Sequence, residues 1–220
     1  MRRVSPAEFV LAHTHIRHAP FVPELRLHLA DEALEIWEAT QLAVDRGDVS
    51  PPFWAFVWAG GQALARHLLD HPDVVAGRQV VDIATGSGIV AVAAARAGAA
   101  DVTAYDVDAF AVAAARLNAR TNDVPVDVRV GDVRDIEVVA ARAPVVVTAG
   151  DVFYDKRIAA AMLPELRRMC TAGAEVLVGD PRRTYLPTGE LDVLASYDVE
   201  VETDLEDGPV KPSVVARLTA

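Results

Sequence analysis

Hydrophobic and polar residues follow different patterns in three regions of this chain. Within the first region, apolar and polar residues alternate along Leu25–Leu29, which predicts a short strand. Asp31 then stands where the N-cap of a helix belongs, because apolar residues at helical spacing follow it. We therefore expect residues 1–50 to be an N-terminal extension that packs on a larger domain, residues 51–220.

The central region, residues 78–180, alternates short apolar runs with helical stretches. This order predicts βαβ units, and hence a parallel sheet with helices on both of its faces. The expected strands are Val80–Ala84, Val102–Tyr105, Val126–Val130, Val145–Ala149 and Val176–Val178. The expected helices are Ile89–Ala97, Ala109–Asn122 and Ile158–Met169, preceded by one from about Gly60 to Asp70 that Pro72 ends.

The pattern changes again after Pro187. Two apolar segments, Val199–Thr203 and Val214–Leu218, predict an antiparallel hairpin at one edge of the sheet, with a turn at Gly208–Pro209. The predicted fold class is therefore α/β, a Rossmann-like sheet with helices on both faces and a C-terminal antiparallel hairpin.

Composition narrows the classes of protein that fit this pattern. The 220 residues are 52% hydrophobic, which excludes a disordered chain, and carry a formal net charge of −11. That acidic balance disfavours binding to nucleic acid or to an anionic membrane through a broad basic face. Cys170 is the one cysteine, so no internal disulfide is expected. With no signal peptide, presequence or membrane-spanning run in the sequence, we expect a cytoplasmic protein.

His13, His15 and His18 form the densest group of possible metal ligands. On a helix their spacing would not place them on one face, and no cysteine or carboxylate cluster completes the set. We therefore expect no metal site.

The most informative local motif is Asp82–Gly88, which ends the first central strand and begins a helix. Gly86 and Gly88 let backbone amides approach a ligand without a Cβ in the way. Asp106 ends the next strand, where a carboxylate can accept the hydroxyl groups of a ribose. Asp132 follows the third strand and could accept from an adenine amino group. At a strand end, however, an aspartate can equally be a turn or helix-capping residue.

Two cofactors compete for this loop. Gly86, Gly88 and Ala91 satisfy the dinucleotide fingerprint, which favours NAD. Asp82 favours the other cofactor, because a carboxylate beside the loop gives nothing to a pyrophosphate but attracts the sulfonium and amino groups of S-adenosylmethionine. We predict S-adenosylmethionine and keep NAD as the alternative.

Segments on both sides of the loop carry a resemblance to a known family. They are Phe53–Trp54–Ala55–Phe56, Trp58, Gly60–Leu64, Leu68–Asp70 with Pro72, Gly150–Asp155 and Gly179–Arg183. The stretch from Pro52 to Arg183 resembles the seven-β-strand protein methyltransferases. Among them it is most similar to the lysine methyltransferases that act on the β-subunit of electron transfer flavoprotein. The tryptophan-containing segment and Gly150–Asp155 are the specific motifs, since many methyltransferases share the nucleotide loop.

The resemblance implies a seven-stranded class I methyltransferase sheet, S-adenosylmethionine as methyl donor and a lysine ε-amine of a folded protein as acceptor. It also implies a monomer whose protein partner is the electron transfer flavoprotein β-subunit. The residues expected to contact the cofactor are Trp58, Ala84, Thr85, Gly86, Gly88, Asp106 and Gly150, beside Asp82 and Asp132. Asp151 and Tyr154 are expected to face the lysine, Asp151 by binding and orienting it rather than by removing its proton.

Two residues depart from the family pattern. Ala84 replaces the usual first glycine of the loop, and Ala59 stands where relatives tend to have proline. An alanine at position 84 is compatible with the loop if its φ is negative.

Other functions share these features. The same loop would serve a small-molecule (nicotinamide-like) N-methyltransferase, a lysine methyltransferase of another protein such as a ribosomal protein, an NAD oxidoreductase or a non-catalytic relative. Individual residues also have two interpretations. Trp54 and Phe56 either fill the core or frame an acceptor cleft, and Tyr154 either closes a lysine channel or packs beneath the next helix.

Overall fold

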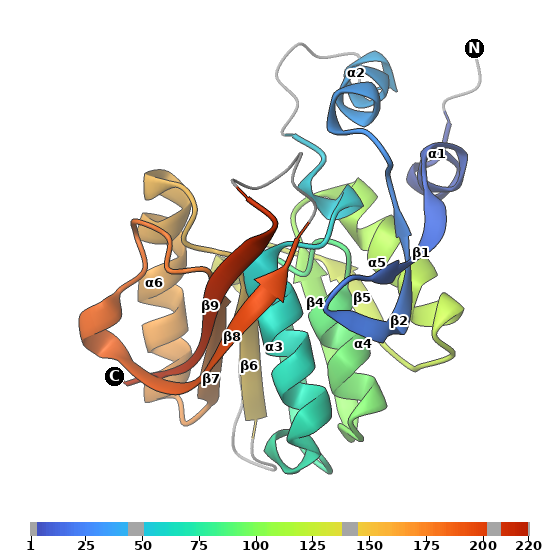
Figure 1. The fold of residues 1–220 in the computed structure, drawn as a ribbon. Helices are drawn as coiled ribbons and strands as arrows, with labels where there is room; N and C mark the ends of the chain where they lie inside the picture. The colour runs from blue at the N-terminus through green and yellow to red at the C-terminus, as the bar shows by residue number, and fades with distance from the viewer. Residues whose placement is uncertain (1–3, 44–50, 138–144, 202–207, 220) are drawn as a thin grey trace.

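A computed structural model of the chain describes residues 4–43, 51–137, 145–201 and 208–219. Within these residues the main sheet has seven strands in the order β5-β4-β3-β6-β7-β9-β8 (Figure 1). The strands are β3 (Gln79–Ile83), β4 (Asp101–Asp106), β5 (Asp127–Val130), β6 (Val145–Gly150), β7 (Glu175–Asp180), β8 (Leu191–Glu200) and β9 (Val210–Leu218). The strands β3 to β7 run parallel, and β9 lies antiparallel to both β7 and β8. The predicted fold class is confirmed.

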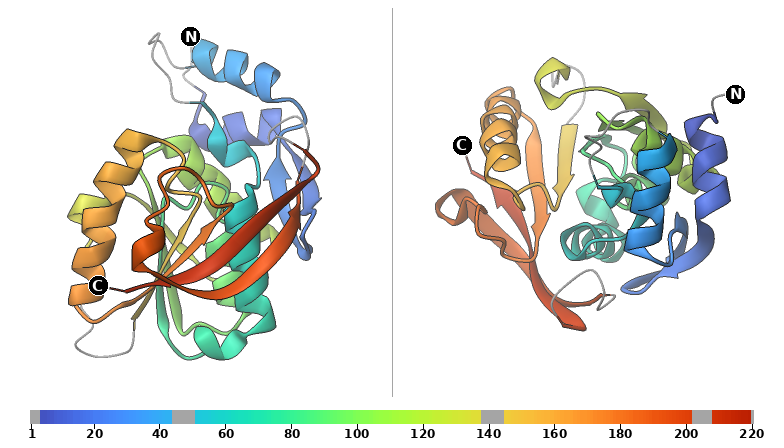
Figure 2. Two further views of the ribbon diagram at one scale, coloured as in Figure 1. Left: turned by 60° about the vertical axis from the view of Figure 1, so that its left-hand side comes forward. Right: turned by 90° about the horizontal axis from the view of Figure 1, so that it is seen from above.

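Helices cover both faces of this sheet. On one side are α3 (Ala59–Asp70), α4 (Ile89–Arg96) and α5 (Ala109–Thr121), and on the other is α6 (Lys156–Thr171) (Figure 2). Short 3-10 helices are η1 (Phe53–Ala55), η2 (Pro72–Val74), η3 (Val133–Asp135) and η4 (Thr188–Glu190). No helix in the described ranges is both long and apolar enough to cross a membrane. Strand order reverses between β3 and β6, the place where open α/β sheets bind ligands.

The N-terminal region contains α1 (Pro6–His13), β1 (His15–Ala19), β2 (Val22–Leu29) and α2 (Ala33–Ala43). The strand predicted around Leu25–Leu29 is confirmed, whereas its partner β1 was missed. The prediction that Asp31 is the N-cap of α2 is wrong by one residue, because Glu32 directly precedes the helix and its carbonyl accepts from Ile36 N. The carboxylate of Asp31 instead lies 3.6 Å from His15 Nε2 and 3.5 Å from Arg17 Nη1.

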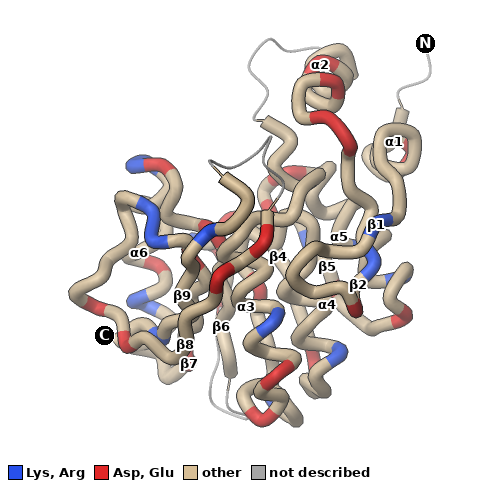
Figure 3. Tube along the Cα trace, in the orientation of Figure 1, with Lys and Arg blue, Asp and Glu red and all other residues tan. Residues whose placement is uncertain are grey.

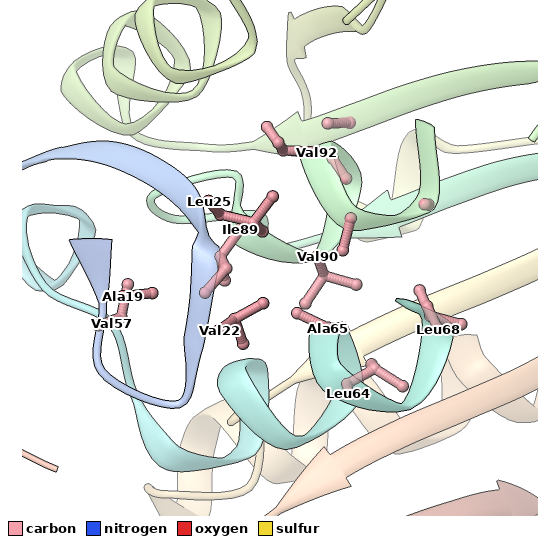
Figure 4. Packing of buried hydrophobic residues seen from close by; sticks show 14 of the residues in the cluster. Ala19, Val22, Leu25, Val57, Leu64, Ala65, Leu68, Ile89, Val90 and Val92 are labelled. Atoms are coloured by element: carbon pink, nitrogen blue, oxygen red, sulfur yellow. The ribbon is translucent and has the colours of Figure 1, made fainter. Parts of the chain in front are cut away.

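The hairpin β1–β2 belongs to the main hydrophobic core. Ala19, Val22 and Leu25 lie in one buried cluster with residues of α3 and α4, among them Leu64 and Ile89 (Figure 4). This burial removes the apolar face of the hairpin from water and fixes the N-terminal region to the sheet.

The side-chain amides of Asn118 in α5 and of its C-cap residue Asn122 complete the backbone hydrogen bonds of β2. The Asn122 amide accepts from Arg26 N at 3.0 Å and donates to Arg26 O at 2.6 Å, as a neighbouring strand would. Asn118 Oδ1 accepts from His28 N at 2.6 Å, and Asn118 Nδ2 donates to Ser87 O at 2.8 Å. The hairpin is thereby linked directly to the loop that follows β3.

The fully buried Gln62 of α3 joins three further segments. Its Oε1 accepts from Phe21 N at 3.0 Å, while Nε2 donates to Val57 O at 3.4 Å and to Glu200 O at 3.5 Å. The polar residue that follows the two glycines of α3 therefore has a structural role.

The C-terminal hairpin is longer than predicted. Its first strand, β8, begins at Leu191 and ends at Glu200, and the predicted residues 202–203 lie outside the described residues. Most residues of β8 are exposed or half-buried because the strand lies at the edge of the sheet. An edge strand of this kind carries no apolar run that marks its start.

Candidate active site

A cavity of ≈ 560 Å³ lies at the carboxyl ends of β3, β4 and β6, where the strand order reverses. Residues from those three strand ends line it, together with η1, the segment before α3 and the first turns of α6. This volume is typical of small-molecule and cofactor sites. The site is thus built from segments far apart in the sequence that the parallel sheet brings together.

The loop after β3 has an unusual backbone. Gly86 and Gly88 have φ values of 53° and 81°, and Ala84 has a φ of 52°. The condition that φ at Ala84 is negative is therefore not met: its backbone is left-handed, a conformation that glycine adopts without cost and alanine does not. Ala84, Thr85 and Gly86 line the cavity.

Gly88 has a packing role. It is the N-cap of α4 and does not belong to the described cavity lining. A Cβ at this position would lie 2.8 Å from the Cβ of Ala115 on α5. The second loop glycine therefore permits α5 to pack close to the loop.

Asp106 supports the loop from the end of β4. Its Oδ2 accepts from Gly86 N at 2.9 Å and its Oδ1 from Asp108 N at 3.0 Å. Burial raises the pKa of this carboxyl, and the two backbone N–H groups partly offset the increase. The predicted ribose-binding residue is therefore in the cavity wall and already oriented by the loop it would serve.

Asp82 lies at the base of the cavity and is 1% exposed. Each carboxylate oxygen accepts from a threonine hydroxyl, Oδ2 from Thr85 at 2.5 Å and Oδ1 from Thr148 at 2.7 Å. Burial raises the pKa of Asp82 to about 6, and the hydroxyl groups hold it below the value that burial alone would give. Sequence reasoning did not identify Thr148, which comes from the neighbouring strand β6.

The structure does not bring Asp132 into this site. Its carboxylate accepts from Arg134 Nε at 2.8 Å and from Arg134 Nη2 at 2.6 Å, and it also caps η3 through Arg134 N. These hydrogen bonds lower the pKa of Asp132 to about 2. The interpretation as a helix-capping residue, left open above, describes its observed contacts.

Asp151 follows Gly150 at the end of β6 and is 9% exposed, with a left-handed φ of 54°. Its Oδ2 accepts from Gly61 N at 2.7 Å, and its Oδ1 lies 3.1 Å from Arg183 Nη2. Burial raises the pKa of Asp151 to about 7, although the Arg183 guanidinium opposes the increase. Sequence reasoning quoted Arg183 as part of a motif but assigned it no role in the site.

Aromatic side chains form one wall of the cavity. The ring of Phe53 lies 5.6 Å from that of Trp58 and 5.4 Å from that of Tyr154, both in edge-to-face geometry. Trp58 Nε1 donates to Phe53 O at 2.9 Å, which fixes the indole. Phe53 and Tyr154 are 40% and 43% exposed, so this aromatic wall (Phe53, Trp58 and Tyr154) faces both the cavity and solvent.

Trp54 and Phe56 both fill the core and line the cavity, so the two interpretations given for them in the sequence apply together. Trp54 is buried and stacks on Phe110 at 6.2 Å between ring centroids, so it is a core residue. Both residues belong to a buried cluster and also contribute to the cavity wall. A substitution at either position would therefore change stability as well as the site.

The three N-terminal histidines bind other groups. His13 Nδ1 lies 2.9 Å from Phe9 O, His18 Nδ1 lies 2.5 Å from Pro23 O, and His15 faces Asp31. Across the residues that the structure describes, no group of three or more possible ligands is arranged for a metal ion.

The charge of the cavity favours a cationic ligand. Asp82, Asp106, Asp108 and Asp151 line it, and Arg183 is the one cation among the described lining residues. A positively charged nucleoside derivative gains from such surroundings, whereas a pyrophosphate does not.

Comparison with known proteins agrees with this geometry. The family described as ribosomal protein L11 methyltransferase (PrmA) matches residues 63–152. The electron transfer flavoprotein beta subunit lysine methyltransferase of Xenopus laevis is 35% identical over 216 residues, covering 96% of this chain and 85% of that protein. Its Rattus norvegicus counterpart is 34% identical, covering 88% and 76%.

Solved structures share the fold. A putative RNA methyltransferase from Pyrococcus horikoshii superimposes with a TM-score of 0.58 at 17% identity, over 79% of this chain and 90% of that chain. Magnesium protoporphyrin IX methyltransferase from Synechocystis, solved with bound SAH, has a TM-score of 0.52 at 12% identity, over 84% and 94%. At these identities the likeness concerns the fold alone.

Proposed function

The chain belongs to the family of electron transfer flavoprotein beta subunit lysine methyltransferases, and we propose that it methylates lysine ε-amines of the electron transfer flavoprotein β-subunit. The observation that carries the proposal is similarity over 96% of the chain to a relative of that name. The acidic cavity at the strand-order reversal supports the same conclusion.

The residues of the cavity fit S-adenosylmethionine, which supplies an electrophilic methyl group when bound. Asp106 is placed to accept the ribose hydroxyls, and the loop Ala84–Gly86 gives backbone groups beside it. The acidic surroundings of Asp82, Asp106 and Asp108 stabilise a ligand that carries a sulfonium and an amino group. Trp58 and Gly150 complete the cofactor side in this proposal.

Asp151 positions the acceptor side. Its carboxyl group is held between Gly61 N and the Arg183 guanidinium, so it has a fixed orientation at the end of β6. We assign it the binding and orientation of the lysine, because an anion beside an amine favours the ammonium form. A protonated lysine must lose its proton before it attacks, and in this scheme the proton leaves through water.

The aromatic wall guides the lysine side chain. Its rings can pack along the apolar stem, and their faces attract an ammonium head. We call the space along the aromatic wall the acceptor channel. Phe53 is the central residue of this channel because it contacts both Trp58 and Tyr154. The other interpretation of Tyr154, simple packing beneath α6, does not explain why this side chain is 43% exposed.

We also propose the division into residues 1–50 as an N-terminal extension and 51–220 as the catalytic domain. The described part of the extension packs on that domain through the hairpin β1–β2. We further propose that the protein is a cytoplasmic monomer and that it does not bind nucleic acid, which its net charge of −11 disfavours.

The direct test incubates the purified protein with isotope-labelled S-adenosylmethionine and recombinant electron transfer flavoprotein, followed by mass spectrometry of the β-subunit. We expect label on lysine, and none with Asp106→Ala, which removes the contact to Gly86 N. Label on another protein in a lysate, but none on this subunit, would change the acceptor assignment. Failure to bind S-adenosylmethionine would refute the activity itself.

A further inference from the structure

Helix α2 has large apolar side chains that are exposed to solvent among the described residues. Leu34, Trp37 and Leu42 are 67%, 39% and 88% exposed. The opposite face of the same helix is buried through Ile36 and Thr40. Exposed large apolar residues clustered on one element, unlike isolated ones, mark an interaction surface.

The buried face fixes α2 to the wall of the active site. Ile36 belongs to one hydrophobic cluster with Trp54 and Phe56, and both of those residues line the cavity. A partner held by the outer face of α2 would therefore be held beside the acceptor channel.

The outer face is also acidic. Glu35 and Glu38 are exposed on it, Glu32 precedes it, and Ala33–Ala43 contains no lysine or arginine (Figure 3). Charge complementarity therefore points to a basic partner surface. A second copy of this chain would bring the same acidic face opposite itself, and an anionic membrane would repel it.

We propose that this outer face of α2, formed by Leu34, Glu35, Glu38 and Leu42 with Trp37 at its margin, docks the basic and apolar surface that surrounds the acceptor lysine on the folded substrate protein. The inference rests on the proposed function and adds the surface that selects the substrate. The acceptor channel can recognise one side chain, whereas selection of a folded protein needs additional contact area. Trp37 is the expected hot spot, since binding hot spots are enriched in tryptophan.

The test compares folded and unfolded substrate. Glu35→Lys and Trp37→Ala are assayed with intact electron transfer flavoprotein and with a short lysine peptide from its β-subunit. We expect kcat/KM for the folded protein to fall about tenfold or more, mainly through KM, and the peptide to react within about twofold of wild type. Asp198→Lys and Val193→Ala on β8, which are also exposed, serve as matched controls with unchanged rates.

Other outcomes separate the two proposals. Unchanged kcat/KM for the folded protein in both α2 variants overturns the docking surface, and so does an equal loss with protein and peptide. A wild-type dimer that Trp37→Ala dissociates on gel filtration would assign the face to a second copy instead. If the wild type transfers no methyl group to either substrate, the proposed function has failed. In that case the affinity of the enzyme for electron transfer flavoprotein is measured by interferometry. Weaker binding by Glu35→Lys than by wild type supports the docking surface, and equal binding overturns it.

Discussion

Gly60 and Gly179 lie so close together that a Cβ on either residue would overlap the carbonyl oxygen of the other. This contact brings the first turn of α3 against the end of β7. The same approach places Gly61 N at 2.7 Å from Asp151 Oδ2. The geometry of the acceptor side therefore depends on two residues that have no side chain.

We expect Gly60→Ala to destabilise the protein by roughly 1–3 kcal/mol, because the added methyl group has no space and α3 must move. Urea unfolding measures the effect. Gly189→Ala is the matched control, since nothing lies within 4 Å of a Cβ at that position. Equal stability of the two variants would contradict the proposed close packing.

Ala84→Gly should increase stability. The left-handed φ of 52° at Ala84 costs about 1–2 kcal/mol for a residue with a Cβ. Glycine removes that cost and loses part of the gain through its greater freedom in the unfolded chain, which leaves up to about 1 kcal/mol. Thermal unfolding of the two proteins checks this value, and a lower Tm for the variant would show that Ala84 is not strained.

Asp151→Asn should remove most methyl transfer and leave the affinity for S-adenosylmethionine within about threefold of wild type. Asparagine keeps an acceptor for Gly61 N but loses the charge that faces Arg183 and the incoming ammonium. Single-turnover rates and calorimetric titration with the cofactor separate the two effects. Wild-type turnover in the variant would refute the role of Asp151.

The raised pKa of Asp151 predicts a specific pH dependence of stability. Because the pKa of Asp151 is about 7 in the folded protein and that of an aspartate in an unfolded chain is 3.8, the folded state binds this proton more firmly. Its contribution to folding is full at pH values below 3.8 and is lost as pH rises through about 7. The stability of wild type relative to Asp151→Asn should therefore fall by roughly 2 kcal/mol between about pH 5.5 and 8. Urea unfolding of both proteins across that range provides the comparison, and a constant difference would contradict the raised pKa.

Phe53→Ala should raise KM for the lysine acceptor about fivefold or more while cofactor affinity stays unchanged. The substitution removes the ring that lies between Trp58 and Tyr154, so the lysine side chain loses the central aromatic surface of the acceptor channel. Phe53→Tyr retains a ring and is expected to restore KM close to that of wild type. Steady-state kinetics with varied acceptor distinguishes this result from a general loss of stability, which would lower kcat as well.

The sequence was informative where local pattern determines position. Asp106 could be predicted because it ends a strand next to the loop, and parallel strands end at the same edge of a sheet. Asp132 also follows a strand, but its side chain pairs with Arg134, two residues further on. A position at the end of a strand places the backbone of an aspartate at the edge of the sheet. The group that its carboxylate contacts then determines whether the aspartate faces the cavity.

Other parts of the site depend on contacts between distant segments. Thr148 of β6 donates to Asp82 of the adjacent strand β3, and Arg183 in the loop after β7 donates to Asp151. No spacing in the sequence encodes either pair. Similarly, β8 was predicted too short because its exposed edge residues carry no apolar pattern.

The buried amide of Gln62 makes the two ends of the chain depend on each other. One side chain binds the turn between β1 and β2, the approach to α3 and the last residue of β8. Neither the N-terminal hairpin nor the final edge strand can detach without leaving a polar group unsatisfied in the interior. Detachment of the hairpin β1–β2 is therefore coupled to detachment of β8. A chimaera that takes only one of these segments from a relative would have to preserve Gln62 and all three of its backbone partners.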